Sequence, residues 1–92
     1  MNFEWDVTKA KANYRKHGLR FEEVVLVFHH PLAWFEMDEN HSEDEERQKV
    51  IGECKRGIVV VIFTERNGVT RLISARFATP RERITYVHRQ RI

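Results

Sequence analysis

The chain has 92 residues, of which 41% are hydrophobic and 33% are charged. A chain of this length forms a single domain, residues 1–92, whose small core leaves room only for a shallow active site. Its one cysteine, Cys54, excludes an intrachain disulfide and a CxxC metal or redox motif. The N-terminal residues do not resemble a signal peptide, and the longest apolar run, residues 58–63, is too short to cross a bilayer. We therefore expect a soluble, cytoplasmic domain.

The charges are distributed unevenly along the chain. Residues 1–46 contain 5 Lys or Arg and 11 Asp or Glu, a net charge of −6, whereas residues 47–92 contain 11 and 3, a net charge of +8. Clustered cations favour a phosphate-rich partner through the release of counterions. The alternative is a solvated basic surface that the acidic segment of the same chain neutralises.

Two helices are predicted near the N-terminus. The first is capped by Asp6 and runs to about Lys16, where a basic last turn and Gly18 end it. The second covers residues 21–28, because apolar residues recur there at helical spacing before Pro31. Residues 33–38 have the character of a short edge strand, and residues 39–46 form a polar, acidic loop.

Three further strands are predicted at residues 48–55, 57–66 and 69–78, joined at Arg56-Gly57 and Asn67-Gly68. Asn-Gly favours a two-residue type I′ turn, and this turn predicts a register for the second hairpin. The expected pairs on one face are Phe63 with Leu72, Val61 with Ser74 and Val59 with Arg76, and those on the other are Ile62 with Ile73 and Val60 with Ala75.

A last helix begins at Thr79-Pro80-Arg81-Glu82, which combines a capping box with a proline at the first helical position. Ile84, Val87 and Arg91 share one stripe of this helix, with Arg83 and Tyr86 beside it. The predicted order is two helices, an antiparallel sheet of three to four strands and a C-terminal helix, an α+β fold.

Arg76 interrupts the apolar strand that precedes this helix. Strand alternation places Ile73, Ala75 and Phe77 on one face of that strand, and Leu72, Ser74 and Arg76 on the other. Arg76 is therefore expected on the face turned away from the helices. There it either presents its guanidinium to a polyanion or pairs with an acidic residue of a neighbouring element.

The sequence contains no complete metal-binding or cofactor-binding motif. Residues 38–49 lack the glycine and glutamate that a calcium loop requires, and His29 and His30 are adjacent rather than on one helix face. What remains is a constellation suited to metal-free RNA cleavage, which needs a base for the 2′-hydroxyl, an acid for the leaving 5′-oxygen and cations for the phosphorane. Its members are His17, Arg47, Arg76, Arg83 and Tyr86, with the carboxylates of Glu45, Glu46 and Glu82.

Five segments resemble the BrnT family of toxins, the ribonuclease halves of bacterial type II toxin–antitoxin pairs. They are EWDVTKAKANYRKHG (4–18), FEEVVLVF (21–28), EERQKVIG (45–52), VVVIFTERNG (59–68) and ISARFATPRERITY (73–86). The resemblance implies a RelE-like fold, endoribonuclease activity without a metal cofactor, and inhibition of translation and growth. It also implies an oligomeric complex with a BrnA-like ribbon-helix-helix antitoxin, which binds operator DNA through the antitoxin.

The motif positions carried over from the family are Lys16, His17, Glu46, Arg47, Ser74, Arg76, Glu82, Arg83 and Tyr86. Our hypothesis is that Arg76 and Arg47 hold the scissile phosphate, that His17 or Glu46 is the base, and that Tyr86 donates a proton or stacks. Lys16, Ser74, Arg81 and Arg83 are the expected RNA-binding residues. The alternatives are that His17 only caps its helix, and that the chain is a non-catalytic module acting with its antitoxin as a repressor.

Overall fold

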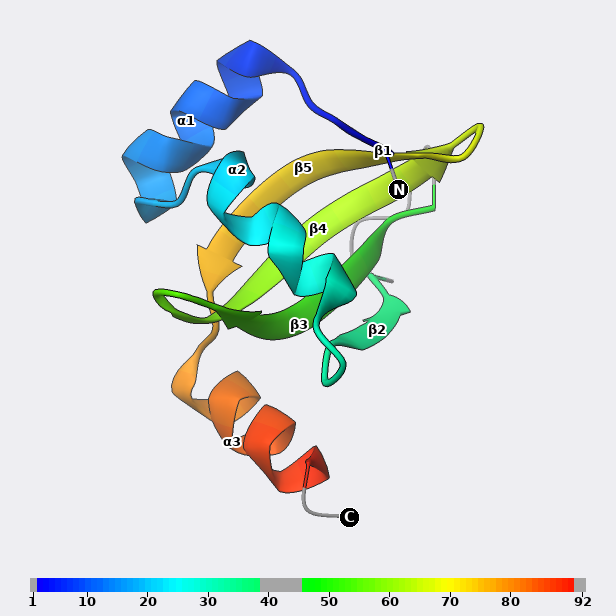
Figure 1. Cartoon of the computed structure of the whole chain (residues 1–92). Coiled ribbons are helices and arrows are strands. Elements are labelled where there is room, and N and C mark those ends of the chain that lie inside the picture. The colour runs from blue at the N-terminus through cyan, green and yellow to red at the C-terminus, as the bar shows by residue number, and fades with distance from the viewer. Residues whose placement is uncertain (1, 39–45, 91–92) are drawn as a thin grey trace.

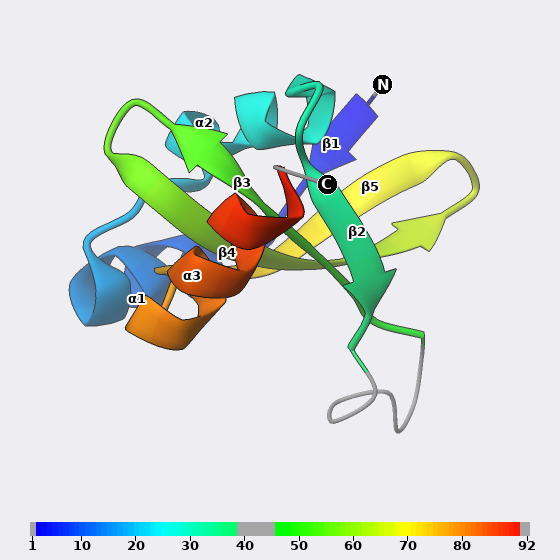
Figure 2. The same ribbon diagram turned by 90° about the horizontal axis from the view of Figure 1, so that it is seen from below.

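The computed structural model describes residues 2–38 and 46–90, and shows a five-stranded sheet with helices on both faces (Figure 1). The helical segments at residues 7–29 cover one face, and the C-terminal helix lies against the other (Figure 2). The elements are β1 (Asn2–Glu4), α1 (Val7–His17), α2 (Phe21–Val24), the 3₁₀ helix η1 (Val25–His29), β2 (Trp34–Met37), β3 (Gln48–Cys54), β4 (Gly57–Arg66), β5 (Val69–Phe77) and α3 (Pro80–Arg89). None of the described helices is long and apolar enough to span a membrane.

The prediction of an α+β fold is confirmed, but the predicted strand count and order are wrong. The sheet has the order β1-β5-β4-β3-β2, and β1 pairs with β5 in parallel, so the sheet is mixed. β1 is only three residues long, and this is too short for alternation of apolar and polar residues to reveal a strand. The predicted strand at residues 33–38 is confirmed as the edge strand β2.

The first predicted helix is confirmed. The carboxylate of Asp6 accepts the backbone N–H groups of Thr8 and Lys9, and Gly18 ends the helix in the left-handed conformation. The second helix is wrong in part, because α2 has only four residues and continues as the 3₁₀ helix η1. The β-branched valines of this segment have low helix propensity, and burial of Val24 and Val27 determines the local geometry.

The β4–β5 hairpin turns at Asn67 and Gly68, whose positive φ angles confirm the predicted type I′ turn. The pair Phe63–Leu72 is confirmed, but a β-bulge follows it, and every other predicted pair is wrong by one residue. The observed pairs beyond the bulge are Ile62 with Ser74, Val61 with Ala75, Val60 with Arg76 and Val59 with Phe77. The hairpin between β3 and β4 turns at Lys55 and Arg56, one residue earlier than predicted.

The bulge explains how the core is assembled from β5. Leu72 and Ala75 both lie in the core, although strict alternation would place residues three apart on opposite faces. The prediction that Leu72 shares a face with Arg76 is therefore wrong. The core lies between the sheet and the helices at residues 7–29, and its buried members are Leu19, Phe21, Val24, Val27, Phe28, Val50, Val59, Val61, Phe63, Leu72 and Ala75.

The C-terminal helix begins as predicted. The hydroxyl of Thr79 accepts the N–H of Glu82, and the carboxylate of Glu82 accepts the N–H of Thr79. The residue of α3 that is buried is Tyr86, whereas Ile84 and Val87 are 71% and 41% exposed. Position 91 of the predicted stripe, and most of the predicted acidic loop, lie outside the described residues.

Candidate functional site

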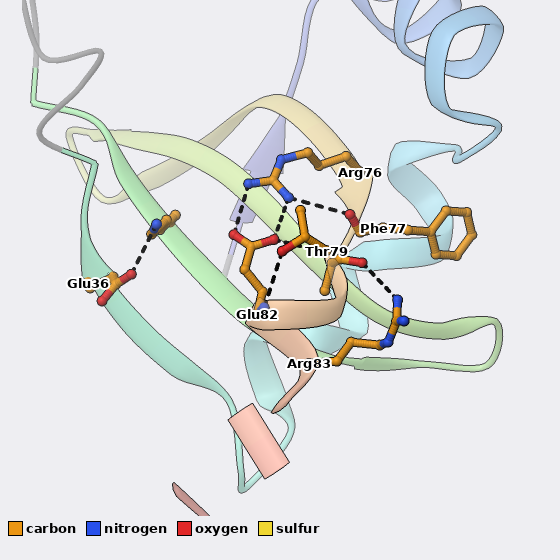
Figure 3. Close-up of polar contacts among 8 residues, drawn as sticks. Glu36, Arg76, Phe77, Thr79, Glu82 and Arg83 are labelled. Atoms are coloured by element: carbon orange, nitrogen blue, oxygen red, sulfur yellow. Dashed lines mark hydrogen bonds and ion pairs between the residues drawn. The ribbon is translucent and has the colours of Figure 1, made fainter. Parts of the chain in front are cut away.

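Arg76 lies on the face turned away from α1, but α3 packs against this face and supplies its partner. The prediction that Arg76 faces away from the helices is therefore wrong in part. Its two terminal nitrogens donate to the two carboxylate oxygens of Glu82 at 2.7 and 3.0 Å (Figure 3). These hydrogen bonds hold the pKa of Glu82 at about 2 and raise the pKa of Arg76, so both groups are ionised at neutral pH. Of the two alternatives for Arg76, the geometry shows pairing with a neighbouring element. We call this bidentate pair the α3 clamp.

His17 lies at the C-terminal end of α1, close enough to Arg76 for the positive charge of Arg76 to affect its pKa. Partial burial lowers the pKa of His17, and the positive charges of Lys16 and Arg76 lower it further. The dipole of α1 favours a protonated histidine at this end of the helix, whereas burial and the nearby cations favour the neutral imidazole, which can accept a proton.

A further cation joins this end of the sheet from the β3–β4 turn. Arg56 donates to the carbonyl of Gly18 at 2.6 Å, and its guanidinium lies over the ring of Phe77, 5.4 Å from the centroid. Arg83 belongs to α3, on the opposite face of the sheet from α1, and donates to the carbonyl of Ala78 at 3.1 Å (Figure 3). We define the basic end by five residues that three elements and one turn bring together. They are Lys16, His17, Arg56, Arg76 and Arg83.

Arg56 is the member of the basic end that the sequence analysis missed. It was noted only as a turn residue, and nothing in a single sequence indicates that this turn packs against the end of α1. Its cation–π contact and its ion pair with Glu23, at 3.4 Å, orient the guanidinium.

Two predicted site residues lie elsewhere. Glu46 and Arg47 precede β3, where the hydroxyl of Thr64 donates to the carbonyl of Glu46 and the N–H of Asp38 donates to that of Arg47. Arg76 pairs with Val60, which pairs with Ile51, and Arg47 is four residues before Ile51. The backbones of Arg47 and Arg76 are thus separated by about 13 Å along the strands and about 10 Å across them. The backbones of these two arginines are therefore well separated, although Asp38, which donates its N–H to the carbonyl of Arg47, is near enough to Arg76 to help raise its pKa.

Tyr86 and the other predicted RNA-binding residues occupy distinct positions. The hydroxyl of Tyr86 is buried and has no hydrogen-bond partner among the described residues, and burial raises its pKa. An RNA strand cannot reach this hydroxyl while α3 is in place. Ser74 is half-buried opposite Ile62, on the same face as Arg76.

Arg81 is exposed and lines a separate groove between α3 and β2. The groove has a volume of about 240 Å³, and the guanidinium of Arg89 stacks over Trp34 inside it, 3.2 Å from the ring centroid. Lys49 lines the same groove and pairs with Glu36 at 3.1 Å. Two of these cations therefore already have partners.

Comparison with known proteins identifies the family of the chain. No curated protein matches the chain significantly. The family model described as the ribonuclease toxin BrnT of type II toxin–antitoxin systems matches residues 5–82, which include His17, Arg56, Arg76 and the start of α3. The chain therefore belongs to the BrnT family of type II toxin–antitoxin ribonuclease toxins.

Proposed function

We propose that this toxin is a metal-independent endoribonuclease whose active site is the basic end. The supporting observation is the position of His17, partly buried and near Lys16 and Arg76, because these surroundings favour the unprotonated imidazole that a general base requires. The imidazole takes the proton of the 2′-hydroxyl, the 2′-oxygen attacks phosphorus, and the 5′-oxygen leaves with a proton from a general acid. The products are a 2′,3′-cyclic phosphate and a free 5′-hydroxyl.

The basic residues bind different parts of the RNA in this proposal. Lys16, Arg56 and Arg83 bind phosphate oxygens at the basic end, where arginine can contact two oxygens at once. Of the two base candidates, His17 is favoured over Glu46, because Glu46 precedes β3 and lies near Thr64, at the other end of the sheet. Arg47 then contacts a flanking part of the RNA strand. Tyr86 can take part in RNA cleavage only if α3 moves away from the sheet, because its hydroxyl is buried.

Arg76 has a dual role in this proposal. It raises the positive potential at His17, and it holds α3 through the α3 clamp. Arg76→Ala removes the cation, whereas Glu82→Gln breaks the same ion pair and leaves the cation in place. If the charge of Arg76 contributes to cleavage, Arg76→Ala lowers the rate by about 100-fold, the usual loss for one such electrostatic group, while Glu82→Gln stays within about tenfold of wild type.

The measurement is cleavage of an RNA oligonucleotide in the presence of EDTA, with the new ends mapped chemically. Growth of cells expressing each variant and its thermal melting are followed in parallel. Equal losses in the two variants would restrict Arg76 to holding α3. Cleavage that EDTA abolishes would refute metal independence.

The regulatory partner in this proposal is a BrnA-like ribbon-helix-helix antitoxin, whose complex with the toxin binds operator DNA. A second candidate function is a binding module that represses its operon without cutting RNA. The neutralised Arg76 and the buried hydroxyl of Tyr86 favour this candidate. RNA that stays intact with folded, antitoxin-free wild-type protein would establish it over the nuclease.

A further inference from the structure

The outer side of α3 carries an apolar surface that its own chain leaves uncovered. Ile84 is 71% exposed and Val87 is 41% exposed, one turn apart on the helix. With Ile58 of β4 they line a groove of about 460 Å³, whose remaining lining residues are Arg83 and His88. We call this the α3 groove.

The side chains of the α3 groove indicate the kind of partner it can bind. Ile58, Ile84 and Val87 are aliphatic and offer no aromatic face on which a nucleobase could stack. They can instead bury apolar side chains of a second protein. Contacts spaced three residues apart suit an amphipathic helix that lies along α3.

The charges around the α3 groove indicate the charge of the partner segment. The basic residues that line the α3 groove are Arg83 and His88, and the one acidic residue of α3, Glu82, is already paired with Arg76. A partner segment that places carboxylates beside its apolar residues would be electrostatically complementary to this rim, whereas a basic segment would be repelled.

We propose that the α3 groove is the docking site for an acidic, amphipathic segment of the antitoxin. This inference rests on the proposed function for the nature of the partner. Arg83 lines the α3 groove and also belongs to the basic end. A segment bound in the groove therefore covers part of the RNA-binding surface. Binding of the antitoxin would then by itself inhibit RNA cleavage.

The test compares Ile84→Lys with Leu26→Lys. Leu26 is 69% exposed on η1, on the other side of the sheet, so the two variants add the same charge at similarly exposed positions. Each variant is co-expressed with the cognate antitoxin, and the affinity of the purified pair is measured. Ile84→Lys weakens antitoxin binding at least tenfold, and Leu26→Lys stays within twofold of wild type. Both variants cleave RNA at the wild-type rate.

Antitoxin binding to Ile84→Lys at wild-type affinity would overturn the proposal, and so would loss of RNA binding in this variant, which would assign the groove to RNA. A dimer of the toxin alone that Ile84→Lys disrupts would assign the groove to a second copy. Val87→Lys provides an independent variant, and circular dichroism checks that both are folded. Absence of RNA cleavage by the wild type would refute the nuclease but leave the comparison of antitoxin affinities valid.

Discussion

The imidazole of His17 is partly buried and lies near two positive charges, and this makes its protonation a direct test of its role. Its pKa lies below the ordinary value of 6.5, so the neutral form predominates above that pH. Below the pKa the protonated fraction grows, and a base-dependent rate falls about tenfold for each further pH unit. We expect the rate of RNA cleavage to rise with pH and to pass its midpoint below pH 6.5.

The same group can be followed without activity, by NMR titration of the His17 ring. Lys16→Gln removes one of the two cations, so the pKa of His17 should rise, yet burial should keep it below 6.5. Lys9→Gln, two helical turns away, serves as the control and should leave the titration unchanged. A wild-type pKa at or above 6.5 would contradict the assignment of His17 as the base.

At the scale of elements, α1 is attached to the sheet by one buried polar side chain. The amide of Asn13 accepts the N–H of Ala75 at 2.9 Å and donates to the carbonyls of Ala75 and Leu19, each at 3.0 Å. β1 pairs with β5 only as far as Arg71, so the backbone of Ala75 has no strand partner on that side. Asn13 therefore takes the place of a neighbouring strand, and it positions His17 one turn further along α1.

Asn13→Ala should destabilise the fold, because it leaves buried backbone groups of Ala75 and Leu19 without partners. Each such group costs about 1–3 kcal/mol, and we expect a total loss of about 3 kcal/mol in the free energy of unfolding. Lys11→Ala, on the exposed side of the same helix, should change it by less than about 0.5 kcal/mol. Urea denaturation of the three proteins measures the difference, and a loss below about 1 kcal/mol for Asn13→Ala would refute this account.

The predictable parts of this fold are those specified by neighbouring residues. The caps at Asp6 and Thr79 and the turn at Asn67-Gly68 follow from local chemistry, and all three were predicted. The bulge after the Phe63–Leu72 pair was not predicted, because no residue beside it carries a local signal for a bulge, such as a glycine.

The same distinction applies to the candidate site. Strand alternation placed Arg76 on the face turned away from α1, but the packing of α3 on that face, and the pairing with Glu82 that follows from it, could be identified only from the structure. The contact of Arg56 with the end of α1 is likewise tertiary. The sequence therefore identifies many residues of such a site, but it does not show which of them contact one another.

For the whole molecule, the uneven charge distribution predicts a binding behaviour. The affinity for single-stranded RNA should fall with salt, because each phosphate contact releases counterions, with a slope of about 0.7 per contact on logarithmic axes. Lys16→Gln or Arg83→Gln should each reduce the slope by about this amount. Arg71→Gln removes the same charge at a site paired with Glu4, at 2.9 Å, and should leave the slope unchanged. Filter-binding titrations at several salt concentrations measure the slopes of the wild type and the three variants, and equal slopes in all four proteins would exclude the basic end as the RNA contact.

The parallel pairing of β1 with β5 joins Asn2 to Val69, two residues that most of the sequence separates. Such a pairing forms slowly, because the entropy of closing the intervening loop must be lost first. The same holds for the approach of His17 to Arg76 and Arg83. The proposed RNA-binding surface therefore exists only in the folded protein, and a partly folded chain lacks it.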